Sequence, residues 1–256
     1  MSRSRSHILL VAVLLGGARV APAQSAAAHV ALGNKERDAR NATAALQHYE
    51  AALAADPNDY DALTDAAYEC VELGEFDPSA DHRAALYRSA EQYARRAVAA
   101  NPRDAEGHFQ LAAALGRNAL TMGVRDRIKF ASEIRNEALA ALAINPKHSG
   151  ALHVMGVWNA EILRVNGLAR AIARRFLGAK IFDAANWDDA QKYLEEAVAS
   201  DSTRIVHRLD LAAVYADRNQ RAKAIEQYEW IARAPVTDYN DPNYKMDATR
   251  RLTALR

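Results

Sequence analysis

The stretch AADPNDYDAL, residues 54–63, recurs in two close copies along this chain of 256 residues. The copies are AANPRDAEGH at residues 99–108 and AINPKHSGAL at residues 143–152. Because proline lacks an amide proton and disfavours helix in the residue before it, each Asp-Pro or Asn-Pro pair marks the end of a helix. The three prolines are 45 and 44 residues apart, and a spacing in this range predicts an array of helical repeats.

The residues on both sides of each turn also repeat, because they fall into columns of one residue type. Two columns hold only alanine or glycine. One lies before the turn, at Ala52, Ala97, Ala141 and Ala197, and the other lies in the helix after it, at Ala67, Ala112, Gly156 and Ala212. Small side chains in such columns let paired helices approach closely. The sequence therefore predicts a stack of helical hairpins.

The complete pattern resembles the tetratricopeptide repeat, in which a helix pair reads W-x2-L-G-x2-Y, then A-x3-F, then P. The resemblance covers most of residues 41–236, as about four repeats. It implies an all-α fold, a right-handed α-solenoid of tetratricopeptide-like hairpins. Three repeats depart from the pattern, because about 11, 10 and 22 extra residues separate their two helices. We therefore expect lengthened helices and loops along one edge of the solenoid.

The two ends of the chain lie outside the repeats. Residues 24–40 are predicted to form an N-terminal helix or linker. Residues 237–256 are predicted to form a capping helix that covers the last repeat with Met246, Leu252 and Leu255, since a terminal repeat needs a polar outer face.

The first 23 residues differ in composition from the rest. A basic start, MSRSRSH, is followed by the apolar run ILLVAVLLGG and later by the small-residue pattern APA at residues 21–23. This order is typical of a cleaved secretory signal peptide and predicts a periplasmic or secreted protein. An uncleaved membrane anchor is the alternative, but an apolar run of about 10 residues is half the length that a spanning helix needs.

Charge and cysteine content restrict the partners and the chemistry. Without residues 1–23 the chain has 30 basic and 32 acidic side chains, a net charge of −2. This balance gives no general attraction to nucleic acid or to anionic lipid. The single cysteine, Cys70, cannot form an internal disulfide, and it falls in a core column. We expect it to be a small buried side chain.

The chain contains none of the common catalytic or cofactor-binding patterns. G-x-G-x-x-G, the P-loop, H-E-x-x-H and G-x-S-x-G are absent from the sequence. The eight histidines are dispersed, and His148 and His153 are five residues apart, which places them on different faces of a helix. The sequence therefore predicts a non-enzymatic protein, with no catalytic residue, no cofactor and no metal site.

A more particular resemblance covers roughly residues 100–250. The stretches AEGHFQLAAALGR (105–117), RNEALAALAINPKHSGALHVMGVWNAEI (135–162) and RRFLGAKIFDAANWDDAQKYLEEAV (174–198) are similar to the regulator of microtubule dynamics family. The recurring features of that family are matched by His153, Gly156, Trp158, Glu161 and the FLG at residues 176–178. The resemblance implies a non-enzymatic repeat protein. Animal members are associated with microtubules, or with organelle contacts and lipids, and an exported chain would not meet microtubules.

The concave face of the first helices is the expected binding surface, because repeats of this type usually bind ligands there. A protein or peptide is the first candidate partner, and a hydrophobic ligand or lipid, in a groove roofed by the long hairpins, is the alternative. In the repeat frame this face presents Asp61, Asp65, Tyr68, Phe109, Gln110, Arg117, His153, Val157, Trp158, Glu161 and Leu209.

The longest extra segment, residues 163–182, has a helical stripe of Val165, Leu168, Ile172 and Phe176. A second candidate surface is the set of basic residues around that stripe, Arg164, Arg170, Arg174, Arg175 and Lys180. Such a helix can lie on an anionic membrane or bind a partner. The favoured interpretation is that the stripe packs on the solenoid and leaves a solvated basic face, and membrane contact is the less favoured alternative.

Overall fold

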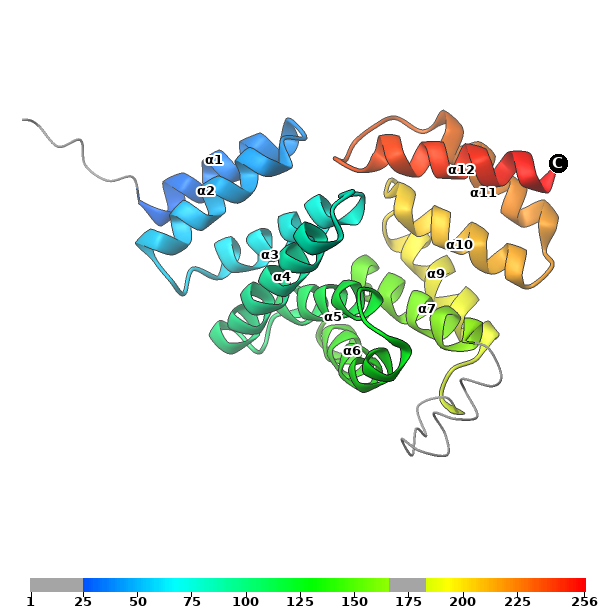
Figure 1. The fold of residues 1–256 in the computed structure, drawn as a ribbon, viewed down its shortest axis with the longest axis horizontal. Helices are drawn as coiled ribbons and strands as arrows, with labels where there is room; N and C mark the ends of the chain where they lie inside the picture. The colour runs from blue at the N-terminus through cyan, green and yellow to red at the C-terminus, as the bar shows by residue number, and fades with distance from the viewer. Residues whose placement is uncertain (1–24, 166–182) are drawn as a thin grey trace, which may run out of the picture.

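The computed structural model describes residues 25–165 and 183–256, and the regular structure within these ranges is helical, with no strand. The helices of the described ranges form five pairs and a last single helix, and Figure 1 shows their arrangement. In chain order they are α1 (Ala26–Asp38) and α2 (Ala42–Ala55), α3 (Tyr60–Glu75) and α4 (Ala80–Ala100), α5 (Ala105–Leu120) and α6 (Val124–Ile144), α7 (Ser149–Arg164) and α9 (Trp187–Ser200), α10 (Ile205–Asp217) and α11 (Arg221–Arg233), and α12 (Asp241–Leu255).

The helix pairs stack into a solenoid with two layers. Each helix packs against its partner in the pair, and the first helices of the pairs also pack against one another in the series α1, α3, α5, α7 and α10, with α12 at the end. That series forms the inner, concave layer. The predicted all-α solenoid of tetratricopeptide-like hairpins is therefore confirmed, and α1 with α2 makes a hairpin before the one that starts at α3.

The lengthened repeats lie in the middle of the solenoid. Helices α3, α5 and α7 have 16 residues and α4 and α6 have 21, whereas α1, α2, α10 and α11 have 13 or 14. The predicted signal peptide and residues 166–182 of the predicted basic segment lie outside the described residues. In the described part of the chain, no helix has both the length and the apolar character that a membrane span requires.

The residue before each proline closes the turn between hairpins with its own side chain. Asp56 ends α2, where its amide donates to the carbonyl of Ala52 at 2.8 Å. Its Oδ1 then accepts a hydrogen bond from the amide of Asn58 at 3.0 Å, which is a turn that Asp and Asn favour. The same pair of bonds recurs at Asn101 and Asn145, and also at Asp201, which precedes Ser202 instead of a proline. These turns explain why Asp or Asn stands at all four positions.

The small-residue columns lie where helices meet. Ala67, Ala112 and Ala212 are fully buried. At Gly156 on α7, an added Cβ would lie 2.5 Å from Cγ of Leu194 and 3.1 Å from the carbonyl oxygen of Ala190, both on α9. Any larger side chain would force these two helices apart, so the column sets their spacing. Cys70, as predicted, is buried in the core, and burial raises the pKa of its thiol to about 12.

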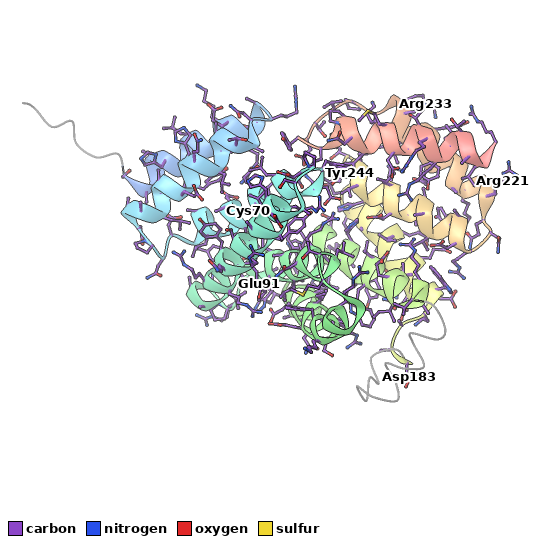
Figure 2. All side chains as sticks on the ribbon, in the orientation of Figure 1. Cys70, Glu91, Asp183, Arg221, Arg233 and Tyr244 are labelled. Carbon is purple, nitrogen blue, oxygen red and sulfur yellow. The ribbon has the colours of Figure 1, made fainter. Side chains whose placement is uncertain are left out.

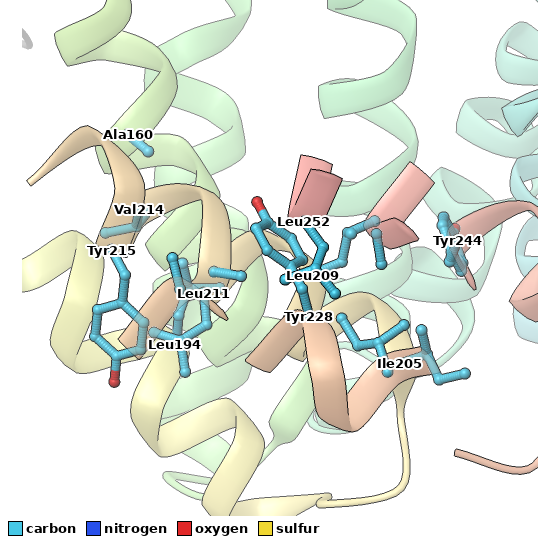
Figure 3. Packing of buried hydrophobic residues seen from close by; sticks show 14 of the residues in the cluster. Ala160, Leu194, Ile205, Leu209, Leu211, Val214, Tyr215, Tyr228, Tyr244 and Leu252 are labelled. Carbon is cyan, nitrogen blue, oxygen red and sulfur yellow. The ribbon is translucent and has the colours of Figure 1, made fainter. Parts of the chain in front are cut away.

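Helix α12 covers the end of the solenoid. Leu252 and Ala248 are buried in the C-terminal core together with Tyr228 of α11, and Leu255 packs against the same cluster (Figure 3). The prediction that Met246 shares this capping role is wrong, because its side chain is 65% exposed. It lies two residues before Ala248, which places it on a face of α12 that points away from the core.

Candidate functional site

An acidic stripe runs along the inner helix α3. Asp65, Glu69, Glu72 and Glu75 are spaced by four, three and three residues, which places them on one helical face. Three arginines from other parts of the solenoid neutralise this stripe, namely Arg37 of α1, Arg117 of α5 and Arg204, the residue before α10. The centre of the concave face is therefore a network of ion pairs between repeats that are far apart in the sequence.

Arg37 holds the N-terminal end of the stripe. Its Nη2 lies 2.8 Å from Oδ1 of Asp65, and its Nε donates to Oε1 of Glu69 at 2.7 Å. Its guanidinium also lies over the rings of Tyr49 and Tyr68, 5.0 and 5.1 Å from their centroids. The Glu69 side chain is only 2% exposed. Burial raises the pKa of its carboxyl to about 7, although Arg37 acts in the opposite direction.

The C-terminal loop meets the middle of the stripe. The hydroxyl of Tyr68 donates to Oδ2 of Asp238 at 2.7 Å, and Arg204 pairs with the same carboxylate. The side-chain Nδ2 of Asn240 donates to the backbone carbonyl of Glu72 and to its Oε2, both at 2.8 Å. Burial and the nearby charge of Asp238 raise the pKa of Glu72. These contacts join residues about 170 positions apart and close the concave face.

A cleft of about 500 Å3 lies at the C-terminal end of the stripe. There Arg117 pairs with Glu75 at 2.8 Å, and the ring of Tyr244 packs edge-on against Phe76 with 5.4 Å between centroids (Figure 2 shows Tyr244 where α12 approaches α3). The cleft is lined by Glu75, Phe76, Arg117, Val206, Leu209, Asp210, Tyr244, Met246, Asp247, Arg250 and Arg251.

A histidine pair lies beside the cleft. Nδ1 of His207 on α10 is 3.1 Å from Nδ1 of His153 on α7, and Nε2 of His153 is 3.2 Å from Oδ2 of Asp210. Neutral rings satisfy both contacts if Nε2 of His153 donates to Asp210 and Nδ1 of His207 donates to Nδ1 of His153, which leaves Nε2 of His207 as an acceptor. That Nε2 is buried without a hydrogen-bond partner. Burial, together with the charges of His153 and Arg204, lowers the pKa of His207 to about 2.

Acid is therefore expected to destabilise the fold through His207. Its folded-state pKa lies below the ordinary value of 6.5, so the unfolded state takes up the proton first. The free energy of unfolding should fall by about 1.4 kcal/mol for each pH unit below about 6.5. Urea denaturation of the His207→Gln variant between pH 7 and pH 5 should lack this contribution. The variant of the exposed His82, His82→Gln, is the control and should keep the wild-type slope; equal slopes in all three proteins would contradict the prediction.

The structure brings some of the predicted concave residues together. Asp65, Tyr68, Arg117, His153 and Leu209 contact the ion-pair network or line the cleft. The exposed Asp61 precedes the stripe on α3, and Val157 packs against the C-terminal core.

The remaining predicted concave residues lie elsewhere. Phe109 packs against the ring of His148, and the buried Gln110 donates to Glu106 at 2.8 Å. Trp158 was predicted on the open groove, but its ring is 5% exposed and its Nε1 donates to the carbonyl of Ala131 on α6 at 2.8 Å. That prediction is wrong, because the side chain fills the space between two helices and cannot meet a partner.

The predicted basic surface is described only at its first residue. Arg164 pairs with Glu161 at 2.7 Å and with Asp217 of α10 at 2.6 Å, so its charge is neutralised on the solenoid. Arg170, Arg174, Arg175 and Lys180 lie outside the described residues. Within the described ranges, no group of three or more His, Cys, Asp or Glu side chains is placed to hold a metal ion.

Sequence reasoning missed most of the ion-pair network. The missed residues are Arg37, Glu69, Glu72, Glu75, Arg204, Asp210, Asp238 and Asn240. The acidic half has a sequence signal, because the spacing of four, three and three along residues 65–75 puts four carboxylates on one helical face. The arginines of the network have no such sequence signal, since they come from three different repeats.

Comparison with solved structures supports the fold. A tetratricopeptide repeat protein of Thermus thermophilus, TTC0263, superimposes with a TM-score of 0.63 at 20% sequence identity, covering 90% of this chain and 98% of that one. PilF of Pseudomonas aeruginosa superimposes with a TM-score of 0.51 at 16% identity, covering 90% and 91%. At these identities the similarity shows a shared helical-repeat architecture only. Among curated proteins, none matches the sequence significantly.

A sequence family gives a more specific assignment. The family described as regulator of microtubule dynamics protein 1-3 matches residues 19–256, which is most of the chain and includes every described helix. The match agrees with the residues at 105–117, 135–162 and 174–198 that first indicated the resemblance. This chain is a helical-repeat protein that belongs to the regulator of microtubule dynamics protein 1-3 family.

Proposed function

We propose that the protein is a non-enzymatic scaffold whose concave cleft binds a segment of another protein. One observation carries this proposal: two large apolar side chains, Phe76 and Met246, are 45% and 65% exposed and both line the cleft. Exposed apolar groups of this size are costly in water, and they serve as anchoring positions in interfaces. The N-terminal pattern at residues 1–23 adds the expectation that the protein meets this partner in the periplasm or outside the cell.

The walls of the cleft favour a peptide over an acyl chain. Six of the lining residues are charged, three acidic and three basic. An acyl chain would remove water from these ion-paired groups and offer them no hydrogen bond in exchange, which costs free energy. A polypeptide offers amides and carbonyls to the charged groups, and its apolar side chains can pack on Phe76 and Met246.

Peptide selection tests this function directly. The chain without residues 1–23 would be immobilised and used to select binders from a random 12-residue peptide library, and the affinity of each binder would be measured by fluorescence anisotropy. We expect Met246→Glu and Phe76→Ser to weaken binding by about tenfold or more, because they remove the apolar anchors. The matched control is Ile144→Glu, at a residue that is 43% exposed outside the cleft, and it should leave the affinity within about twofold. Failure to select any binder, or equal loss in all three variants, would refute the proposal.

A further inference from the structure

The loop between α11 and α12, residues 235–240, lies against α3 in the concave face. Its backbone shape is set by its own acidic side chains. Oδ2 of Asp241 accepts hydrogen bonds from the amides of Thr237 and Asp238 at 2.7 and 2.8 Å, and Oδ1 of Asp238 accepts from the amide of Tyr239 at 2.7 Å. The loop therefore does not depend on α3 to satisfy these amides.

Two side chains make the polar contacts from the loop to the rest of the concave face. Asp238 is bound by the hydroxyl of Tyr68 and by Arg204, whose Nη1 also donates to that hydroxyl at 3.0 Å. Asn240 is bound by the backbone and side chain of Glu72. An arginine and a tyrosine hydroxyl that converge on one carboxylate form a charge-assisted recognition site for an acidic side chain.

The loop can leave this site without unfolding α12. Val236 and Tyr239 are 39% and 40% exposed, so residues 235–239 have little apolar contact with the solenoid, whereas Asn240, directly before α12, is buried. Helix α12 is anchored separately by Ala248 and Leu252 in the C-terminal core. The contact with α3 thus consists mainly of side-chain bonds that an equivalent group from another chain can replace.

We propose that Arg204 and Tyr68 form a recognition site for an acidic side chain of the partner protein, and that Asp238 fills this site in the free protein. The partner segment then carries an aspartate or glutamate that displaces Asp238, and its neighbouring residues reach the cleft that Tyr244 and Met246 line. This inference rests on the proposed function, because it names the chemistry of the segment that the concave face binds.

The charges around the site fit a single carboxylate. When Asp238 leaves, Arg204 keeps the hydroxyl of Tyr68 and the carboxylate of Glu72, whose Oε1 lies 3.9 Å from its Nη2. The side chain of Arg204 is 31% exposed, so an incoming group has access to it. A second negative charge would meet Glu69 and Glu72 on α3. The site therefore prefers an isolated acidic residue over an acidic cluster.

The covalent attachment of the loop makes Asp238 a strong competitor. A group held by a short linker has an effective concentration in the millimolar range. A free peptide with the same sequence must compete with that concentration, so the wild-type protein should bind it weakly. Removal of the Asp238 carboxylate abolishes the competition and leaves Arg204 and Tyr68 in place.

The test uses the chain without residues 1–23 and a labelled synthetic peptide that copies residues 234–243, APVTDYNDPN. We expect Asp238→Ala to bind this peptide about tenfold or more tightly than the wild type does, by fluorescence anisotropy. Asp238→Ala also removes the oxygen that accepts from the amide of Tyr239, and this loss could disturb the loop. Asp238→Asn keeps an acceptor oxygen there and should also bind the peptide more tightly than the wild type does. Glu226→Ala, which removes an exposed acidic residue of α11 that does not line the cleft, should bind like the wild type.

Two further measurements decide the specificity. Asp238→Ala should bind a peptide with asparagine in place of its first aspartate no more tightly than the wild type does. The double variant Asp238→Ala with Arg204→Gln should likewise lose the tighter binding of the original peptide. Equal binding of the two peptides, or no gain in either Asp238 variant, would overturn the inference. Peptides from the random library that bind the cleft without competing with the copy of residues 234–243 would overturn this inference alone and leave the proposed function in place.

Discussion

Replacing Arg37 by methionine is expected to lower the free energy of unfolding by about 2–3 kcal/mol at pH 8, because it leaves buried carboxylates without their partner. Arg37 is paired with Asp65 at 2.8 Å and with Glu69 at 2.7 Å. Methionine keeps most of the apolar contact with Tyr49 and Tyr68, so the loss should come from the ion pairs. Part of the Arg37 side chain is exposed, and solvent screening keeps the expected loss below that of a fully buried pair.

The loss should depend on pH in a defined direction. The folded-state pKa of Glu69 is about 7, above the ordinary value of 4.5, so its contribution to stability falls as the pH rises from 4.5 through 7. Without Arg37 this pKa rises further. Glu69 of the unfolded state has lost its proton well below pH 6, so a higher folded-state pKa extends the loss of stability to higher pH in the variant. The difference between wild type and Arg37→Met, measured by urea denaturation, should therefore be larger at pH 8 than at pH 6.

A second substitution separates the charge from the packing. Glu69→Gln in the Arg37→Met background removes the unpaired charge and should restore about half of the loss at pH 8. Glu69→Gln alone completes the double-mutant cycle and gives the cost of that substitution when Arg37 is present. If the double variant is as unstable as Arg37→Met at both pH values, the ion pair with Glu69 does not account for the effect.

Truncating Leu194 to alanine is expected to cost about 3 kcal/mol of unfolding free energy, because this fully buried side chain fills the space between α7 and α9. Gly156→Ala should also destabilise, by about 1 kcal/mol, since its new methyl group would lie 2.5 Å from Cγ of Leu194. The better helix propensity of alanine offsets part of that clash.

The two changes should compensate when they are combined. In the double variant, the methyl group at residue 156 occupies space that Leu194→Ala vacates. Its loss should be smaller than the sum of the single losses by about 1 kcal/mol. Gly116→Ala is the control, because no atom lies within 4 Å of its Cβ position, and it should stabilise by about 0.5–1 kcal/mol. Additive losses in the double variant would show that Gly156 does not set the spacing of α7 and α9.

The fold could be predicted because its determinants are local and repeated. The turn at Asp56-Pro57 and the columns that contain Ala67 and Gly156 each specify a contact between helices that are adjacent in the sequence. Four copies in one frame then specify the stacking of the whole array. The lengthening of the hairpins formed by α3 to α6 followed from the same frame, because the extra residues lie between two columns whose positions were known, but the length of each helix did not.

The site could be predicted only in part, because its contacts are not local. The repeat frame predicts Tyr68 and Arg117 on one face, and both belong to the ion-pair network, but it could not pair Tyr68 with Asp238, 170 residues later. That contact depends on how far the solenoid curves over five helix pairs, and small differences in packing at each step add up along the array. Trp158 was misplaced for a related reason, since the column pattern does not distinguish the concave face from the seam between α7 and α6.

The self-closed turns at Asp56, Asn101, Asn145 and Asp201 have a consequence for how this architecture can change. Each turn fixes the joint between consecutive hairpins with a side chain from within the turn, so it does not depend on the far edge of the hairpin. Length can be added at that far edge in whole helical turns, as α4 and α6 show with 21 residues each. The turns therefore fix the angle between consecutive hairpins. The length of each hairpin can change from repeat to repeat while the curvature of the solenoid is retained. Foreign sequence, such as an epitope or a reporter domain, is best inserted at the connection between α5 and α6.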